Sequence, residues 1–267
     1  MEKFINKEKT MGNKNGTPLK TASEDILYGV NPVTEALKAG RRRIYELFLA
    51  GEKASDRISG LADLAGSLNI PLTRMDGLEL SRIAGTDSHQ NVAARVSAYP
   101  FSGISDILAK RHKEGAPFIL ILDGVEDPQN LGALARTALG AGVDGIIIPK
   151  DRAALPTPSA SKASAGALEH IHLVRETNLV NIIKDLKKEG FWITGLDAEA
   201  KTSLYEGDFS SATALVVGGE GRGLRDLVKK HCDYLVFIPQ KGPLSSLNAS
   251  VAGALSMYEV VRQRQKQ

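Results

Sequence analysis

The chain has 267 residues, of which 42% are hydrophobic and 24% are charged, and its formal net charge is +3. This composition supports one large or two ordinary globular domains, and the mild positive charge permits a nucleic-acid partner without identifying one. No apolar run approaches the roughly 20 residues that span a bilayer, and the Lys-rich N-terminus lacks the apolar block of a secretory signal, so we expect a cytoplasmic protein without membrane contact.

The first part of the chain divides into a polar tail, a small α/β domain and a linker. Residues 1–24 contain almost nothing to bury, which predicts a flexible tail. Apolar periodicities then predict a domain over 25–100, in which helices and strands alternate. Its expected helices cover 32–38, 55–68 and 78–83, and its expected strands cover 44–49, a stretch ending near 74, and 92–98. A Pro- and Gly-containing break and a charged helix-like stretch over 104–114 make 101–116 the expected linker.

The C-terminal half, residues 117–267, has the pattern of an α/β sheet domain. Short, continuously apolar runs predict buried strands at 118–122, 145–149, 191–196, 213–218 and 234–239. Helical periodicity separates and follows them, at 131–139, 159–168, 179–188, 224–230 and 249–264. This alternation predicts a mostly parallel sheet with helices on both faces. Ligands of such sheets bind beyond the carboxyl ends of the strands, so we expect the site in the loops there.

Three of those loops carry polar side chains close to a strand end. The loop at 123–138 enters a helix, the loop at 218–224 is rich in glycine, and the segment at 238–253 also leads into a helix. The side chains that could act chemically are Asn130, Arg136, Glu220, Ser246 and Asn248. Taken singly, each loop also fits a turn, a general phosphate-binding loop or a helix cap. Their joint occurrence in one domain favours a shared site.

These loops contain three motifs that resemble, in order, those of the SpoU/TrmH ribose methyltransferases. The motifs read NLGALARTA at 130–138, LVVGGEGRGL at 215–224 and IPQKGPLSSLNASVA at 238–252. Two upstream segments, LYGVNPVTEAL at 27–37 and HQNVAARV at 89–96, are similar to the substrate-binding domain of the RlmB branch of that family. The resemblance therefore covers nearly everything after the tail.

The resemblance implies a fold and an activity. It implies a C-terminal domain with a deep trefoil knot that forms the cofactor pocket, a homodimer through that domain, and a small N-terminal α/β domain like ribosomal protein L30e. The implied reaction is S-adenosylmethionine-dependent methylation of a ribose 2′-hydroxyl, in a guanosine of bacterial 23S ribosomal RNA. The chain departs from the branch at Asn91, where glycine is usual, and at Gln240 and Lys241, where a more apolar pair is usual.

The resemblance also implies binding roles for individual residues. Main-chain groups would hold the cofactor at Leu196, Gly218, Gly219, Ile238 and Leu247. The expected RNA contacts of the N-terminal domain are Arg41, Arg42, Arg43, His89 and Gln90. A solvated surface turn and a structural histidine are the alternative explanations for that second set. No metal is expected, because Cys232 has neither a CxxC partner nor a spaced histidine pair.

By the same resemblance, Arg136 lies nearest the reacting ribose. Asn130 and Glu220 would hold the geometry, and Ser246 and Asn248 would complete the site from the third loop. A guanidine pKa above about 12 makes the neutral form scarce at pH 7, which disfavours Arg136 as a general base. We therefore expect Arg136 to act as a cation that binds the adjacent phosphate and stabilises a developing 2′-alkoxide, while the proton leaves to another group or to water.

Two other classes of function fit parts of the sequence. A dinucleotide-dependent oxidoreductase also places a glycine-rich loop between a strand and a helix, but the spacing here is GxGxG, and Gln240 and Lys241 stand where the ribose-binding acid is expected. A non-catalytic RNA-binding module would have lost its chemical side chains, whereas all three motifs keep theirs. Nicotinamide binding would identify the first class, and RNA binding without methyl transfer would identify the second.

Overall fold

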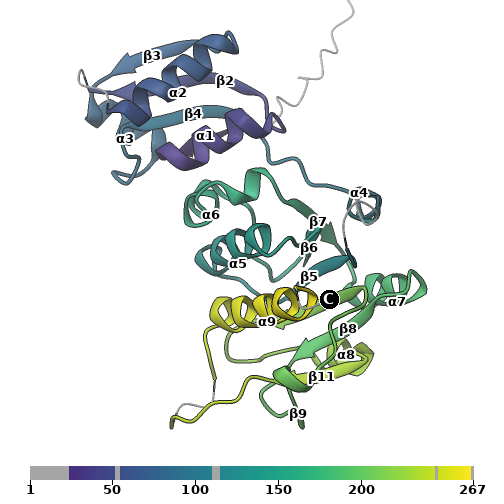
Figure 1. The fold of residues 1–267 in the computed structure, drawn as a ribbon. Helices are drawn as coiled ribbons and strands as arrows, with labels where there is room; N and C mark the ends of the chain where they lie inside the picture. Colours follow the sequence, from purple (N-terminus) through teal and green to yellow (C-terminus); the bar gives the residue numbers. More distant parts are fainter. Residues whose placement is uncertain (1–23, 52–54, 110–114, 244–245, 266–267) are drawn as a thin grey trace, which may run out of the picture.

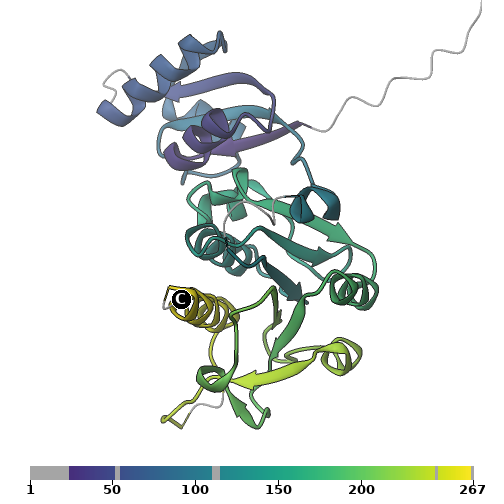
Figure 2. The same cartoon turned by 45° about the vertical axis from the view of Figure 1, so that its right-hand side comes forward.

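The structure is a computed structural model that describes residues 24–51, 55–109, 115–243 and 246–265. Of the predicted tail at 1–24, residues 1–23 lie outside the described residues, and Glu24 is part of a strand. The strands form two separate sheets, one in each half of the chain, at opposite ends of an elongated molecule (Figures 1 and 2). No helix in the described part of the chain combines the length and the apolar character needed to cross a membrane.

The N-terminal sheet has four strands in the order β1-β4-β2-β3. Its strands are β1 (Glu24–Tyr28), β2 (Ile44–Ala50), β3 (Leu72–Met75) and β4 (Val92–Ser97), and its helices are α1 (Val30–Ala39), α2 (Asp56–Ser67) and α3 (Gly77–Ala84). Side chains alternate along β2, so Leu47 and Leu49 face the core formed with α1 and α2, whereas Phe48 and Ala50 face α3. Helices thus cover both faces of this small α/β unit. The sequence analysis predicted every element except β1.

The segment expected to link the two halves packs against the C-terminal sheet. Its helix α4 (Ile104–Leu108) is shorter than the predicted helical stretch, whose residues 110–114 lie outside the described residues. The Ser102 amide donates to the Leu173 carbonyl at 2.9 Å, and Ile107 is buried in the C-terminal core. These contacts tie the beginning of the segment to the C-terminal half.

The C-terminal sheet has seven strands in the order β7-β6-β5-β10-β8-β11-β9, and every pairing in it is parallel. The strands are β5 (Phe118–Asp123), β6 (Gly145–Pro149), β7 (His172–Glu176), β8 (Trp192–Leu196), β9 (Thr202–Ser203), β10 (Thr213–Gly218) and β11 (Tyr234–Phe237). The five predicted strands are confirmed. The two that were not predicted, β7 and β9, form the edges of the sheet, where few apolar side chains are required.

Helices cover both faces of this sheet, as expected (Figure 1). The α-helices are α5 (Pro128–Gly140), α6 (Pro158–Ala163), α7 (Leu179–Lys188), α8 (Asp226–His231) and α9 (Ala249–Arg264), and the 3-10 helices are η1 (Ala167–Glu169) and η2 (Leu204–Glu206). Leu120 and Leu122 of β5 pack towards α5 and α9, whereas Ile119 and Ile121 pack towards α7. This two-sided burial explains why the central strands are apolar at every position.

The two halves of the chain meet where α1 lies against the segment containing α6 and η1. Glu35 of α1 and His170 are hydrogen-bonded, with 2.8 Å between Oε2 and Nε2. Gly166 has a φ of +88°, and a Cβ added there would lie 2.7 Å from the Glu35 Cβ. The Lys162 ammonium donates to the Ser88 carbonyl across the same junction. The junction is therefore close-packed as well as polar.

Candidate functional site

The three loops singled out in the sequence converge at one end of the C-terminal sheet. They follow β5, β10 and β11, and the first and third lead into α5 and α9. Parallel strands present their carboxyl ends at a single edge, which brings segments about 100 residues apart in the chain together. Contacts between α5 and α9 hold the first and third loops in place.

Glu220 lies at the centre of this convergence and joins the other two loops. Its Oε1 accepts hydrogen bonds from Asn130 Nδ2 at 2.8 Å and from Asn248 Nδ2 at 2.6 Å. Asn248 is also the N-cap of α9, and its Oδ1 accepts from the amide of Val251, which fixes the direction of its NH₂ group. One carboxylate and two oriented amides thus form a single polar cluster from all three motifs.

Glycine is required where the second loop passes the turn after β5. A Cβ added to Gly219 would lie 1.9 Å from the carbonyl oxygen of Gly124, and one added to Gly218 would lie 2.3 Å from the carbonyl carbon of Gly223. Real side chains do not make such approaches to backbone, so neither position accommodates a larger residue without movement of the chain. The sequence analysis expects the main chain at these glycines to hold a cofactor, and the structure adds that the backbone there passes close to other backbone.

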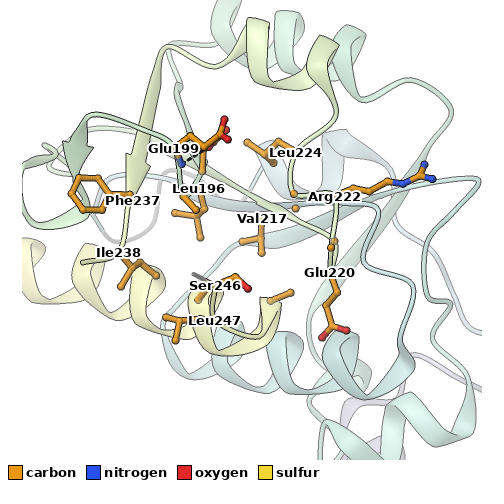
Figure 3. Close-up of a pocket in the computed structure, with 18 of the residues that line it drawn as sticks. Leu196, Glu199, Val217, Glu220, Arg222, Leu224, Phe237, Ile238, Ser246 and Leu247 are labelled. Carbon is orange, nitrogen blue, oxygen red and sulfur yellow. Dashed lines mark hydrogen bonds between the residues drawn. The ribbon is translucent and has the colours of Figure 1, made fainter. Parts of the chain in front are cut away.

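Beside the cluster lies a cavity of about 1110 Å³. The five residues expected to hold a cofactor all line it, as does Ser246. Figure 3 shows the side chains of Leu196, Ile238 and Leu247 gathered on one side of this cavity and Glu220 on another. The site therefore combines an apolar wall, exposed main chain at the glycines and a polar cluster at one end.

The sequence analysis did not single out the charged residues at the end of β8. Asp197 and Glu199 line the same cavity, and the Lys229 ammonium pairs with both. The hydrogen bond to Asp197 raises the pKa of Lys229. A carboxylate just beyond an apolar parallel strand is a frequent partner of ribose hydroxyls, and the sequence LDAE after β8 carries that signal.

Arg136 does not lie with the other predicted chemical residues. It is exposed on α5, lines neither the large cavity nor a smaller one beside it, and makes no hydrogen bond or ion pair with any described residue. Six positions separate it from Asn130, which places the two side chains on different faces of the helix. Within one chain, Arg136 therefore does not lie beside Asn130, Glu220, Ser246 and Asn248, with which the sequence analysis grouped it.

Two of the three arginines at 41–43 make hydrogen bonds or ion pairs within the protein. Arg42 is buried, with Nη2 2.5 Å from Asp25 Oδ2 and Nη1 3.5 Å from Glu169 Oε1. Arg41 donates to the carbonyl oxygens of Ile171 and Pro100 and to the Ser102 hydroxyl. Arg43 alone of the three is exposed, beside the ring of Tyr45. The expected phosphate contact is thus replaced by a structural role for Arg42, and Arg41 is held at the junction of the two halves.

The two remaining residues expected to bind RNA occupy a tight turn before β4. His89 is buried, and its ring bonds to the Ser81 hydroxyl and to the amide of Asn91, which matches the structural alternative. Gln90 is exposed, and its Oε1 accepts from the amide of Val30. Asn91 has a φ of 61°, a left-handed conformation that explains why glycine is usual at this position and why asparagine is tolerated.

The fold and the site together define a class of protein. A parallel sheet covered on both faces, with a large cavity beyond its carboxyl ends and a carboxylate–amide cluster beside that cavity, is typical of α/β enzymes that bind a nucleotide-like ligand. Within the described residues, no group of three or more His, Cys, Asp or Glu side chains is placed to hold a metal ion.

Comparison with known families identifies the family within that class. The model of the SpoU rRNA Methylase family matches residues 117–258, and the model described as RNA 2′-O ribose methyltransferase substrate binding matches residues 26–102. The chain therefore belongs to the SpoU rRNA methylase family.

Individual relatives agree over nearly the whole chain. The 23S rRNA (guanosine-2′-O-)-methyltransferase RlmB of Pseudomonas aeruginosa is 40% identical over 89% of this chain and 96% of its own length. The Bacillus subtilis protein YacO, named for the TrmH family of tRNA/rRNA methyltransferases, is 41% identical over 90% of this chain and 96% of its own. The SpoU methyltransferase AviRb of Streptomyces viridochromogenes, solved with AdoMet, has a TM-score of 0.76 at 25% identity and covers 91% of this chain and 92% of its own.

Proposed function

We propose that this chain transfers a methyl group from S-adenosylmethionine to the 2′-hydroxyl of a guanosine in bacterial 23S ribosomal RNA, in the cytoplasm. The observation that carries the proposal is the bonding of Glu220 to both Asn130 and Asn248 beside a cavity of about 1110 Å³. The names of relatives at about 40% identity support the RNA and the nucleotide. Membership of the methylase family argues against the oxidoreductase, and the intact polar cluster argues against an inert RNA-binding module.

The residues around the large cavity suit S-adenosylmethionine. Its adenine and ribose would lie against the apolar wall of Leu196, Ile238 and Leu247, with the main chain at Gly218 and Gly219 supplying amide and carbonyl groups. S-Adenosylmethionine supplies a methyl group on a positively charged sulfur. The cavity's task is to hold the ligand so that a ribose oxygen can approach in line, which is largely a matter of positioning.

The polar cluster would orient the RNA hydroxyl. Both amides donate to Glu220 Oε1, and no described residue bonds to Oε2, which leaves that oxygen to accept a hydrogen bond from the ribose. Arg136 would contribute a positive charge that binds the adjacent phosphate and stabilises the developing alkoxide. In one chain Arg136 lies outside the cavity, so this role requires a second copy to bring it there.

A homodimer through the C-terminal domain is part of the proposal. One face of α9 exposes Val251, Leu255 and Tyr258, at 47%, 43% and 53%, and Leu139 at the end of α5 is 42% exposed beside them. The stripe continues to Leu247, which lines the mouth of the large cavity. A second copy on this stripe would bury its apolar side chains and cover the cavity mouth. We also propose that the third motif threads through the C-terminal fold as a deep trefoil knot.

A charge placed in the α9 stripe is expected to break the dimer. Leu255→Glu would bury an unpaired carboxylate between the two copies, which should raise the dimer dissociation constant by about 100-fold or more. Leu227→Glu on α8 is the matched control, because Leu227 is also apolar and exposed, at 64%, but lies away from the stripe. Sedimentation velocity over a concentration series measures both variants. A wild-type chain that stays monomeric at tens of micromolar, or an unchanged Leu255→Glu dimer, would contradict the proposal.

The function is tested by mapping ribose methylation across ribosomal RNA from cells with and without this chain. We expect one guanosine of 23S RNA to lose its 2′-O-methyl group and the wild-type chain to restore it. Asn248→Ala should fail to restore it, because the variant removes a donor to Glu220. The control is Asn178→Ala, which removes an equivalent N-cap from α7 outside the site. An unchanged methylation map would refute the proposed function.

A further inference from the structure

A second cavity, of about 670 Å³, adjoins the polar cluster and is not needed for the cofactor. It lies between the turn after β5, the first turn of α5 and the glycine-rich loop after β10. The two cavities share the lining residues Gly219, Glu220, Arg222, Gly223 and Ala249, so they adjoin at the glycine-rich loop. A ligand in the second cavity would therefore reach Glu220 next to a ligand in the first.

Three arginines line this second cavity, and two of them have no partner among the described residues. Arg225 is engaged, because its Nε lies 2.5 Å from Oδ1 of the buried Asp123. Arg152 and Arg222 are exposed, and neither makes a hydrogen bond or ion pair with any described residue. Figure 3 shows the Arg222 side chain extending away from Leu196 and the rest of the apolar wall. Arg152 thus lines only the smaller cavity, and Arg222 stands where the two cavities adjoin.

The backbone at Arg152 is a further indication of a specific role. Its φ is 56°, a left-handed conformation that is unfavourable for a residue other than glycine. Asparagine or glycine would relieve this strain, yet an arginine is presented there, in the loop after β6. Strained conformations of this kind gather at ligand-binding positions.

Most of the carboxylates that line this cavity already have a hydrogen-bond or ion-pair partner. Asp123 pairs with Arg225, and Asp127 caps α5 by accepting from the Gln129 amide. Glu220 accepts from its two amides. Glu126 is the one exposed carboxylate among the described lining residues without such a partner, against two free guanidinium groups. Among the described lining residues, Arg152 and Arg222 are therefore the cations left to bind an anion that arrives from solvent.

We propose that Arg152 and Arg222 bind the RNA backbone phosphates that flank the target nucleotide, and that this nucleotide enters the second cavity. Guanidinium groups bind phosphate through paired, charge-assisted hydrogen bonds. A cavity of several hundred cubic ångströms is large enough for one nucleotide turned out of its stack. The ribose would then meet Glu220 where the two cavities adjoin, within reach of the methyl group of a cofactor in the first cavity. This inference rests on the proposed RNA methyl transfer and assigns its phosphate contacts.

The test compares Arg152→Gln, Arg222→Gln and the double variant with Lys184→Gln, which removes one exposed positive charge from α7 outside both cavities. RNA affinity is measured over a range of salt concentrations, and S-adenosylmethionine affinity is measured by calorimetry. We expect each arginine variant to weaken RNA binding by about tenfold and the double variant to reduce the salt slope by roughly 1 to 2. Cofactor affinity should be unchanged in Arg152→Gln, because that residue lines only the second cavity.

Equal RNA affinity and equal salt slope in the double variant and in Lys184→Gln would overturn the phosphate contacts. Loss of cofactor binding in Arg152→Gln would also overturn them, because it would make Arg152 a structural residue of the loop. Failure of the proposed function is a separate result. A wild-type chain that methylates no RNA, while Arg152→Gln still weakens RNA binding, would refute the methyl transfer and leave the phosphate contacts standing.

Discussion

Gly219→Ala is expected to abolish S-adenosylmethionine binding and to lower the free energy of unfolding by about 3 kcal/mol. The added methyl group would meet the Gly124 carbonyl oxygen at 1.9 Å, and both partners are backbone, so no side chain can move aside. The turn after β5 and the glycine-rich loop would have to separate. That movement would displace Glu220 and the main chain lining the large cavity. Calorimetric titration with the cofactor and denaturant unfolding measure the two effects.

Gly242→Ala is the control for this variant. Gly242 lines the same cavity, but a Cβ added there meets no atom of a described residue within 4 Å, and its φ is not in the left-handed region. We expect its cofactor affinity and its stability to stay close to those of the wild type. If Gly219→Ala bound the cofactor within about twofold of Gly242→Ala, the close crossing of the two loops would not govern the cavity.

Arg136→Ala is expected to lower the single-turnover rate of methyl transfer at saturating RNA by about 10²- to 10³-fold, the usual effect of removing one group that stabilises developing negative charge. Arg136→Lys should keep a measurable rate, because a lysine ammonium with a pKa near 10.4 remains charged at pH 7. Some loss is still expected, since lysine cannot bind phosphate through two parallel hydrogen bonds. Rapid-quench measurements with labelled cofactor separate this chemical step from product release.

The outcome discriminates between two roles of Arg136. If Arg136→Lys is as slow as Arg136→Ala, the simple cationic role is wrong and a group specific to arginine is required. Lys184→Ala, an exposed cation on α7, controls for the general effect of lost positive charge. Mixing Arg136→Ala with Asn248→Ala tests whether the residues act across the dimer. Recovery of activity in mixed dimers is expected if Arg136 serves the partner's cavity.

Much of the C-terminal fold could be predicted because its central strands are buried on both faces. Runs such as FILIL and TALVV are apolar at every position, which specifies interior parallel strands and, through them, where the loops meet. Edge strands lack this signal. His172–Glu176 buries only Leu173 and Val174 and ends in charged residues, so its short pattern was missed.

The residues of the site were predictable to different degrees. Asn130, Glu220 and Asn248 come together because each follows the carboxyl end of a parallel strand. Once the strands are predicted, the meeting of these loops at one edge of the sheet follows. The surroundings of Arg42 were not predictable, because Glu169 lies over 120 residues away and belongs to the other half of the chain. Burial raises the pKa of Glu169, and the Arg42 guanidinium opposes that shift. Sequence alone could not distinguish such a buried pair from an exposed phosphate-binding cluster.

The junction between α1 and the α6–η1 segment has a consequence for how a target is chosen. Glu35 abuts Gly166 on one side of that segment, and on the other side Gly132 of α5 packs so closely that an added Cβ would lie 2.5 Å from Ala163. Close packing contacts thus connect α1 of the N-terminal domain, through the α6–η1 segment, to α5, the helix that carries Asn130. These contacts would hold the N-terminal domain at a constant distance from the site. If the N-terminal domain binds the RNA, only a nucleotide at one fixed distance from that contact could reach the site beside Asn130.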